Sequence, residues 1–293
     1  MRRYKLLKQR LDMNLSLKEV QNVMLEMILY IDKICREKDI KYSLFYGSLL
    51  GAIRHEGFIP WDDDFDIILT RENYEKLLAH LRADTKSSYY LGEIENGAIY
   101  DMRCVKLYHK NYYAKSINPY DAVNKEFSIA IDIFVLHKLP ENGKELYLID
   151  LINSLKDLRK TDLSSYYKSG KKKRNIYKAI LLFPRTIYYK FFVTRARLLK
   201  RLRELEIKYE NEEAKECGVA VYYPGRKLRE IYNKEYFENY VDISFCGHKL
   251  MCIKEYDTVL RMIYDDYLTP PPEEQRKMHY LFYKKKLEQD QIC

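Results

Sequence analysis

The stretch FYGSLLGAIRHEGFIPWDDDFDIIL, residues 45–69, holds most of the residues that decide the fold and chemistry of this chain. It overlaps the apolar and aromatic segment YSLFYGS (42–48), which predicts a short buried strand ending in a Gly-Ser turn. The following SLLGAIRH predicts a short helix that opens at Ser48. FDIILT (65–70) predicts another buried strand, and RENYEKLLAHL predicts an amphipathic helix.

The densest chemical signal in this stretch is WDDDFDI, residues 61–67, with four carboxylates in five positions. Such carboxylates repel one another, and a fold tolerates them on an open surface or around a cation. In a strand that begins near Asp64, Asp64 and Asp66 share one face, because side chains alternate. Two such carboxylates offer the hard oxygen ligands that Mg²⁺ prefers. A solvated acidic turn is the alternative interpretation.

A third carboxylate, Asp132, is the only charged residue in the most apolar segment of the chain, FSIAIDIFVL (127–136). A buried carboxylate must be neutralised, paired with a base or bound to a metal. Together with Asp64 and Asp66 it forms the three-carboxylate pattern used for phosphoryl chemistry on one or two metal ions. The alternative is a structural salt bridge to an arginine such as Arg103.

The pair Gly47-Ser48 precedes these carboxylates. Glycine lets the backbone turn and lets a phosphate approach closely. A helix that starts there offers free N–H groups and the positive end of its dipole to an anion. The pair predicts a phosphate position beside the carboxylates, although many strand–helix turns contain the same residues.

Strands that alternate with helices in the first half predict an α/β or α+β core around one mixed sheet. Ser16, with Glu19 in the capping-box position, predicts the start of a helix that runs to about Lys38. The composition changes after about Pro140, and we divide the chain into a catalytic core at 1–140, a basic helical region at 141–218 and a C-terminal region at 219–293 that closes the active site. Within this division, 142–168 and 186–216 are expected to be helical.

The basic surplus of 9 charges indicates an anionic partner: a nucleotide, a phospholipid surface or a nucleic acid. No nucleic-acid motif is present, and the cysteines lack a CxxC pair, which favours reduced thiols. We find no signal peptide and no run long enough to span a membrane. We therefore expect a cytoplasmic protein. Residues 170–203, basic and aromatic, favour a peripheral position on the inner face of a bacterial membrane, with a packed helix pair as the alternative.

The stretch 45–69 resembles the signature of the LicD family of phosphocholine transferases, which is related to fukutin and lies within the DNA polymerase β-like nucleotidyltransferase superfamily. The superfamily pattern of Gly-Ser, Asp-x-Asp and a later Asp is matched by Gly47-Ser48, Asp64-Phe65-Asp66 and Asp132. IYDDYLTPPPEEQRKMH (263–279) is similar to the closing motif of the family, with Tyr-Asp-Asp where the family usually has Tyr-Gly-Asp.

This resemblance implies an α+β fold with a nucleotidyltransferase-type mixed sheet flanked by helices and with a helical C-terminal half. It also implies transfer of phosphocholine from CDP-choline to a hydroxyl of a bacterial surface glycan, such as lipopolysaccharide or teichoic acid, or of its lipid-linked precursor, with release of CMP. Mg²⁺ (or Mn²⁺) held by Asp64, Asp66 and Asp132 would bridge the diphosphate, and Asp132 could accept the proton of the attacking hydroxyl.

Further residues are candidates for substrate binding beside Gly47 and Ser48. Trp61, the only tryptophan, is a candidate wall for the choline cation, because a quaternary ammonium is best held against aromatic faces. Arg54, Arg103 and His279 are candidates for the donor phosphates, and Arg276 shares a face with His279 if both lie on one helix.

Three alternatives remain. A CDP-ribitol or CDP-glycerol transferase keeps the site and changes the donor. A true nucleotidyltransferase also keeps it. A basic membrane-binding module without catalytic activity is the non-enzymatic alternative, which the carboxylate triplet disfavours.

Overall fold

The computed structural model describes residues 11–92, 104–116, 128–139, 197, 200, 204, 207–210, 213–219, 230–276, 278 and 280–285. The chain divides into two compact units. Described residues within 1–118, 124–136 and 235–293 belong to the first unit, and those within 137–234 belong to the second.

The first unit combines helices with a mixed sheet and two smaller sets of strands. Its helices are α2 (Leu17–Glu37), α3 (Tyr46–His55), α4 (Arg71–Ala83), α9 (Tyr256–Tyr264) and the 3-10 helix η3 (Glu273–Gln275). Its strands are β1 (Leu11–Asn14), β2 (Ser43–Leu44), β3 (Asp66–Thr70), β4 (Tyr89–Gly92), β5 (Val105–His109), β6 (Tyr112–Ser116), β7 (Ala130–Lys138, whose last two residues fall in the second unit), β10 (Tyr240–Phe245), β11 (His248–Ile253) and β12 (Tyr280–Lys285).

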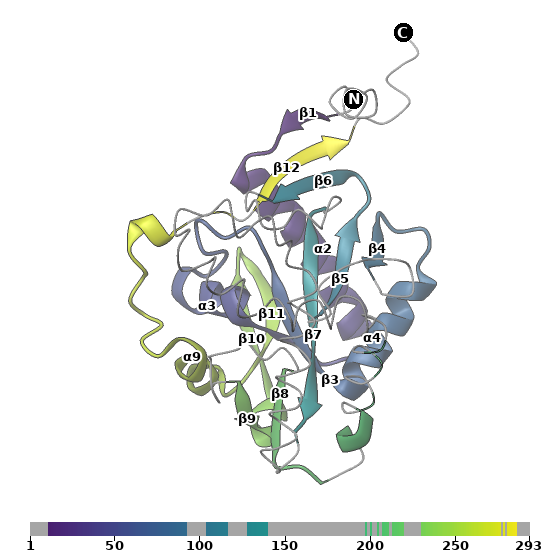
Figure 1. Cartoon of the computed structure of the whole chain (residues 1–293), viewed down its shortest axis with the longest axis vertical. Coiled ribbons are helices and arrows are strands. Elements are labelled where there is room, and N and C mark those ends of the chain that lie inside the picture. The colour runs from purple at the N-terminus through teal and green to yellow at the C-terminus, as the bar shows by residue number, and fades with distance from the viewer. Residues whose placement is uncertain are drawn as a thin grey trace, which may run out of the picture. The chain divides into compact units, whose positions relative to one another are not determined.

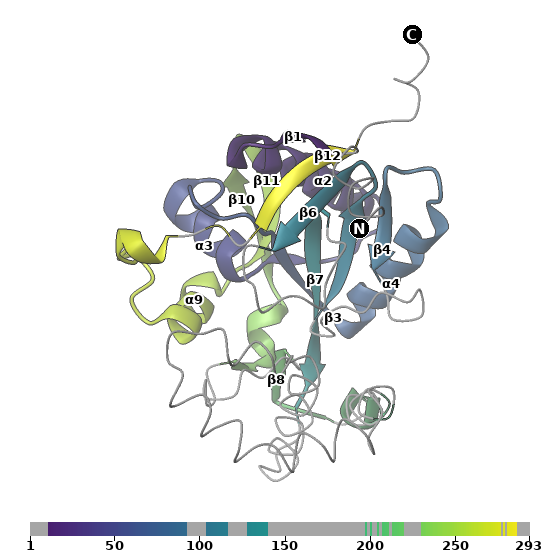
Figure 2. The same ribbon diagram turned by 45° about the horizontal axis from the view of Figure 1, so that its top comes forward.

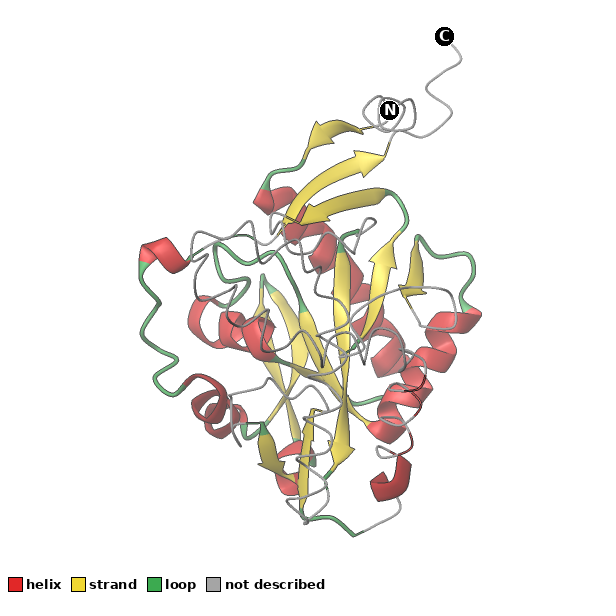
Figure 3. Ribbon diagram, viewed as in Figure 1, coloured by secondary structure: helices red, strands yellow, loops and turns green. Residues whose placement is uncertain are grey.

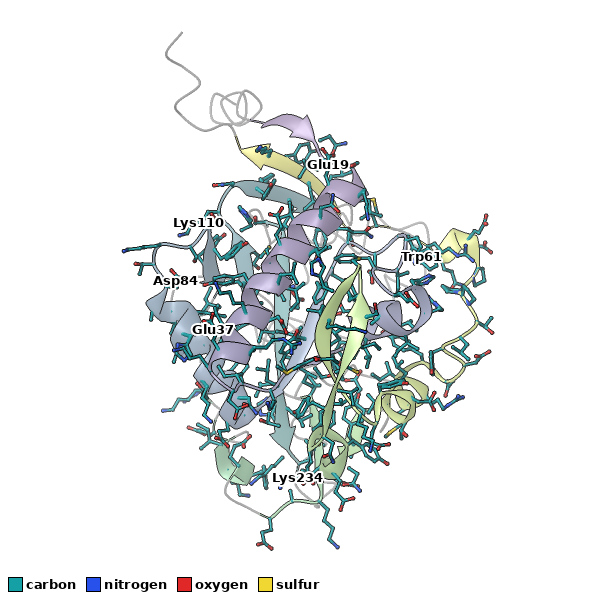
Figure 4. The ribbon with its side chains drawn as sticks, turned by 180° about the vertical axis from the view of Figure 1, so that it is seen from behind. Glu19, Glu37, Trp61, Asp84, Lys110 and Lys234 are labelled. Atoms are coloured by element: carbon teal, nitrogen blue, oxygen red, sulfur yellow. The ribbon has the colours of Figure 1, made fainter. Side chains whose placement is uncertain are left out.

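Helix α2 forms where the apolar spacing predicts it. Ser16 and Glu19 make the predicted capping box, in which each side chain accepts from the other's backbone N–H. The apolar side chains that recur at helical spacing are buried, and Figure 4 shows the helix crossing one face of the sheet. Burial of this stripe, rather than helix propensity alone, holds α2 in place.

The main sheet has the strand order β2-β3-β7-β5-β4 (Figure 1). Strands β3 and β7 are parallel, whereas β2 pairs antiparallel with β3, and β5 pairs antiparallel with both β7 and β4. The predicted α+β class with one mixed sheet is therefore confirmed. The more specific nucleotidyltransferase-type core stays a prediction.

The turn between β2 and α3 differs from the prediction. It precedes the acidic loop, which we define as residues 59–65. The strand covers only Ser43–Leu44, and α3 begins at Tyr46 rather than at Ser48. Tyr46 has a φ of 40°, a left-handed value that turns the chain into the helix before the glycine is reached. Gly47 and Ser48 consequently lie inside the first turn of α3.

The hairpin β10–β11 packs against this region. Its two-residue loop, Cys246-Gly247, has positive φ at both positions, the conformation that fits the twist of a tight hairpin. The Cys246 N–H donates to the carbonyl of Glu56 at 2.7 Å, and a Cβ atom added to Gly57 would lie 2.8 Å from the Cys246 sulfur. Glycine at position 57 thus allows the hairpin tip to approach the loop that follows α3.

A third group of strands consists of β1, β12 and β6, in that order (Figure 2). Strand β12 pairs antiparallel with both neighbours, so the C-terminal strand joins segments from the first half of the chain. This arrangement brings the residues just before β12 close to the acidic loop, as the contacts of Asp63 show below.

The predicted helical C-terminal half is not supported. The described residues after 210 are mainly strands and loops, with α9 and short 3-10 helices (Figure 3). In the second unit, β8 (Glu216–Val219) pairs with β9 (Ile231–Asn233), and residues 207–210 are helical. The segment 142–168 and most of 186–216 lie outside the described residues. Charge and apolar content favoured helices, whereas strand pairing between distant segments decides this part of the fold.

Tyr42 is the polar group that ties three elements of the first unit together. Its buried hydroxyl donates to Asp32 of α2 at 2.8 Å and accepts from the Met251 N–H of β11 at 3.3 Å. We expect Tyr42→Phe to lower the free energy of unfolding by about 1–3 kcal/mol, because it leaves buried polar groups without a partner. Urea unfolding measures this. Tyr90→Phe, at an exposed tyrosine, is the control, and equal stability of the two variants would contradict the role of Tyr42.

Candidate active site

Three charged residues lie side by side on neighbouring strands. In the register of the sheet, Asp66 of β3 is opposite Asp132 of β7, and Asp132 is opposite Lys106 of β5. Residues directly opposite one another point to the same face of a sheet. The sheet therefore places two carboxylates and one ammonium group in a row across its central strands.

Lys106 is the residue that sequence reasoning missed. Its Nζ donates to both carboxylate oxygens of Asp132, at 2.6 Å for Oδ1, and the two side chains are 20% and 14% exposed. Burial alone would lower the pKa of Lys106, but Asp132 raises it well above its usual value, so Lys106 stays protonated. Asp132 is thus paired with a base, one of the options expected for a buried carboxylate, and the base is Lys106 rather than an arginine. Arg103 lies outside the described residues.

The acidic loop approaches the first turn of α3 at Gly47. A Cβ atom added to Gly47 would lie 2.6 Å from Oδ2 of Asp62 and 3.9 Å from Oδ1 of Asp64. Only glycine leaves room for the Asp62 carboxylate at this point. The predicted proximity of Gly47 to the acidic loop is therefore present, but a carboxylate occupies the space beside it.

Ser48 positions the carboxylate row rather than standing free for a ligand. Its buried hydroxyl accepts the Asp66 N–H at 2.8 Å. This bond fixes the first residue of β3 against α3. The Gly-Ser pair therefore helps to position the carboxylates. Gly47 leaves space for the Asp62 side chain, and Ser48 holds the first residue of β3 by a hydrogen bond.

Two further contacts hold the acidic loop. Gln21 of α2 donates from Nε2 to the carbonyls of Ile59 and Asp62, at 3.2 and 3.1 Å. Asp63 is buried and accepts the Tyr280 N–H at 2.8 Å. Asp63 thus anchors the loop to β12.

The electrostatics of the site are dominated by like charge. Burial raises the pKa of Asp66 well above its usual value, and Asp64, Asp132 and Asp62 raise it further, while Lys106 acts against them. Burial, with Asp64 as the next cause, raises the pKa of Asp62 to about 9. Four carboxylates thus interact around one lysine, and Asp62 and Asp66 favour their protonated forms unless a cation compensates their charge.

The residues suit a divalent cation in chemistry and charge. Carboxylate oxygens are the ligands preferred by Mg²⁺ and Mn²⁺. The four carboxylates are close enough to perturb one another, yet in the part of the chain that the structure describes no group of three Asp, Glu, His or Cys side chains is arranged to hold a metal ion. Their mutual repulsion nevertheless fits a cation site, because rotation of the side chains can turn Asp66, at the start of β3, and Asp64, in the loop before it, toward an ion.

The predicted substrate-binding residues divide into two sets. Arg54 and Trp61 lie in the described part, where the Arg276 guanidinium carbon stands 4.8 Å from the centre of the Trp61 ring. His279 and Arg103 lie outside the described residues. The helix expected to bring Arg276 and His279 together is not found, since Arg276 follows η3 and residue 278 is not helical.

The closing motif contains a backbone feature that fits its resemblance. Asp265, which stands where the family usually has glycine, follows α9 with φ 58° and ψ −107°. Left-handed φ values favour glycine. The turn expected for the family is therefore made here by an aspartate.

The pairing of Lys106 with Asp132 can be tested by a double-mutant cycle on metal-free protein. Lys106→Met should cost about 3–5 kcal/mol of unfolding free energy, because it leaves a buried carboxylate without a counter-charge. Adding Asp132→Asn should recover part of that loss, with a coupling of at least about 1 kcal/mol. Guanidinium unfolding measures all variants. The exposed pair Asp257–Arg261 is the control, with coupling below about 1 kcal/mol. Simple additivity at Lys106 and Asp132 would contradict the pairing.

Comparison with known proteins agrees with this geometry. Residues 39–146 match the family model described as LicD/FKTN/FKRP, nucleotidyltransferase domain. This range contains Gly47, Ser48 and the whole row of Asp66, Lys106 and Asp132.

Two of the similar proteins extend the comparison. The chain is 28% identical to the lipopolysaccharide cholinephosphotransferase LicD of Haemophilus influenzae over 268 residues, which is 91% of this chain and 97% of that protein. An uncharacterised protein of Rickettsia typhi is 28% identical over 120 residues, 39% of this chain and 38% of that protein. Residues 39–146, which include these site residues, are therefore similar to the nucleotidyltransferase domain of the LicD family.

Proposed function

We propose that the protein transfers phosphocholine from CDP-choline to a hydroxyl of a bacterial surface glycan, or of its lipid-linked precursor, and releases CMP in a Mg²⁺-dependent reaction. The family domain and the Haemophilus influenzae relative support a phosphotransferase enzyme. The observation that carries the proposal is the likeness to a lipopolysaccharide cholinephosphotransferase along 91% of the chain. The buried row of Asp66, Asp132 and Lys106 adds a site suited to phosphoryl chemistry.

The residues take distinct roles in this proposal. Asp64, Asp66 and Asp132 would hold the cation, with Asp62 beside them. When bound, the cation supplies charge neutralisation at the diphosphate of the donor. Lys106 fixes the orientation of Asp132, which stays our candidate to accept the proton of the attacking hydroxyl. Lys106 donates to both oxygens of Asp132, so the proton would have to bind one of the lone pairs that Lys106 leaves unused.

The other donors fit the same carboxylates, because the row contacts the phosphate end of any nucleoside diphosphate alcohol. CDP-ribitol, CDP-glycerol and CTP therefore belong in the test of the donor. Arg276 lies over the Trp61 ring that is the candidate wall for choline. This contact affects which head group the site can bind, and does not affect the class of reaction.

The membrane-surface position stays a prediction. Apart from Arg197 and Lys200, residues 170–203 lie outside the described residues. Within the described part of the chain, no helix is both long enough and apolar enough to cross a membrane.

The carboxylates are tested by Asp64→Asn and Asp66→Asn. Each should lower transfer by at least about a hundredfold, because the charge of the donor is then poorly neutralised. Excess EDTA should have the same effect on the unaltered protein. Asp39→Asn, which removes an exposed carboxylate, is the control.

Stability separates a catalytic loss from unfolding. In EDTA at pH 7, Asp66→Asn should be at least as stable as the unaltered protein. The raised pKa of Asp66 means that ionisation favours the unfolded chain as pH rises above about 4. Full activity of either variant would contradict the site, and a large loss of stability would point to a structural role.

The donor is tested by thermal unfolding in Mg²⁺. CDP-choline should raise the melting temperature by binding the native state, and CMP should raise it less, because it lacks the second phosphate. The same series with CDP-ribitol, CDP-glycerol and CTP ranks the alternatives, and release of CMP confirms turnover. Stabilisation by CTP without stabilisation by CDP-choline would favour the true nucleotidyltransferase.

A further inference from the structure

A cluster of cations and aromatic rings lies next to the acidic loop and is not explained by the carboxylate site. Trp61 directly precedes Asp62 in the chain, and Figure 4 labels it on the side of the molecule that carries the yellow turn of η3. The Arg276 guanidinium carbon lies 4.8 Å from the centre of the Trp61 ring, and the His55 ring approaches its edge with centroids 6.4 Å apart. The cluster joins α3, the acidic loop and the segment after η3.

Arg276 has a carbonyl partner and one long ion pair, with the exposed carboxylate of Glu273. Its Nε donates to the carbonyl of Pro271 at 2.9 Å, and its Nη1 is 3.9 Å from Glu273, which is beyond hydrogen-bond distance. Stacking on an aromatic ring covers the flat face of a guanidinium and leaves its edge donors directed outward. Trp61 therefore holds the guanidinium group, and among the described residues its Nη atoms make no hydrogen bond, only the long ion pair with Glu273.

Arg54 is likewise hydrogen-bonded to neutral acceptors. Its Nη1 donates to the carbonyl of Tyr267 at 2.9 Å and its Nε donates to Nε2 of His55 at 3.0 Å, so both partners are neutral acceptors. Both cations border the same aromatic cluster, Arg54 through His55 and Arg276 through the Trp61 ring. Burial lowers the pKa of Arg54, Tyr264 raises it, and the positive charge of Arg276 lowers it. Among the described residues neither arginine has a carboxylate within hydrogen-bond distance.

Two partly buried guanidinium groups that repel each other are stabilised when an anion lies between them. A diphosphate is the anion that matches two arginines, because each guanidinium can donate two parallel hydrogen bonds to a phosphate. The position beside Asp62 sets such an anion next to the carboxylates of the proposed transfer site.

We propose that Arg54 and Arg276 form the binding site for the diphosphate of the nucleotide donor, and that Trp61 is a positioning residue that holds Arg276 for this contact. This assignment rests on the proposed use of a nucleoside diphosphate donor. It differs from the choline-wall role expected for Trp61, because Arg276 covers one face of that ring. It leaves the identity of the alcohol head group open.

The test measures the dissociation constants of CDP, CMP and CDP-choline by calorimetry for Arg276→Gln, Arg276→Lys and Trp61→Leu. Arg276→Gln should weaken CDP and CDP-choline equally, by at least about tenfold, because charge-assisted bonds are lost. CMP, with one phosphate, should weaken less. Trp61→Leu should produce the same pattern to a smaller extent, since it removes the platform and leaves the charge. Arg276→Lys should rescue binding in part.

The matched control is Arg71→Gln, which removes another arginine stacked on a ring, that of Tyr74 in α4. It should leave all three constants unchanged. Trp61→Phe keeps a ring and covers the case in which Trp61→Leu does not fold. In steady state, Arg276→Gln should raise KM for the donor far more than it lowers kcat.

The outcomes are distinct. If Trp61→Leu weakens CDP-choline but not CDP, the ring holds the quaternary ammonium and the assignment is wrong. Unchanged CDP binding by Arg276→Gln, or a shift only in KM for the glycan acceptor, would also overturn it. If both variants weaken CDP while CDP-choline is not turned over by the unaltered protein, the diphosphate site stands and the phosphocholine donor is refuted.

Discussion

The first unit is organised around repulsion among carboxylates that are brought together out of water. Four carboxylates interact with one another and with a single lysine, Lys106: those of Asp62, Asp64, Asp66 and Asp132. Asp66 is buried on a central strand. Like charges in a poorly solvated place cost free energy, and a fold carries that cost only where surrounding bonds are numerous or a counter-ion compensates. Many neighbouring contacts in this unit serve to hold those carboxylates where they are.

The supporting contacts come from segments distant in sequence. The Gln21 side chain of α2 donates hydrogen bonds to two carbonyls of the acidic loop. The Tyr280 N–H of β12 donates a hydrogen bond to the Asp63 carboxylate. Ser48 holds the first residue of β3. The hairpin β10–β11 meets the loop after α3 through Cys246. Because four separate elements restrain one loop, its carboxylates have little freedom to move apart, and their mutual repulsion is preserved rather than relaxed.

The sequence reveals those features that depend on local spacing. The isolation of Asp132 in an apolar strand and the capping box at Ser16 are readable within a few residues. The strand face expected for Asp64 and Asp66 is not found, because β3 begins at Asp66 and Asp64 lies in the loop before it. Lys106 could not be found in this way, because its role depends on the register between β5 and β7. Its only signal was its position between the apolar residues Val105 and Leu107. The stacking of Arg276 on Trp61 joins segments from opposite ends of the unit, and no local pattern predicts it. The expectation of a helical C-terminal half failed for a related reason, since β10, β11 and β12 owe their structure to pairing.

The row of Asp66, Asp132 and Lys106 also has a consequence for how the chain reaches its native pairing. Slipping β5 by one residue against β7 would place Val105 or Leu107 opposite Asp132 and turn Lys106 to the other face of the sheet. Apolar residues on both faces of these strands would tolerate such a slip, because each misaligned pair still buries hydrocarbon. The charged pair does not tolerate it, since a carboxylate would then be enclosed without its counter-charge. The Lys106–Asp132 pair thus favours the native register of β5 and β7 during folding, over the shifted registers that hydrophobic contact alone would allow.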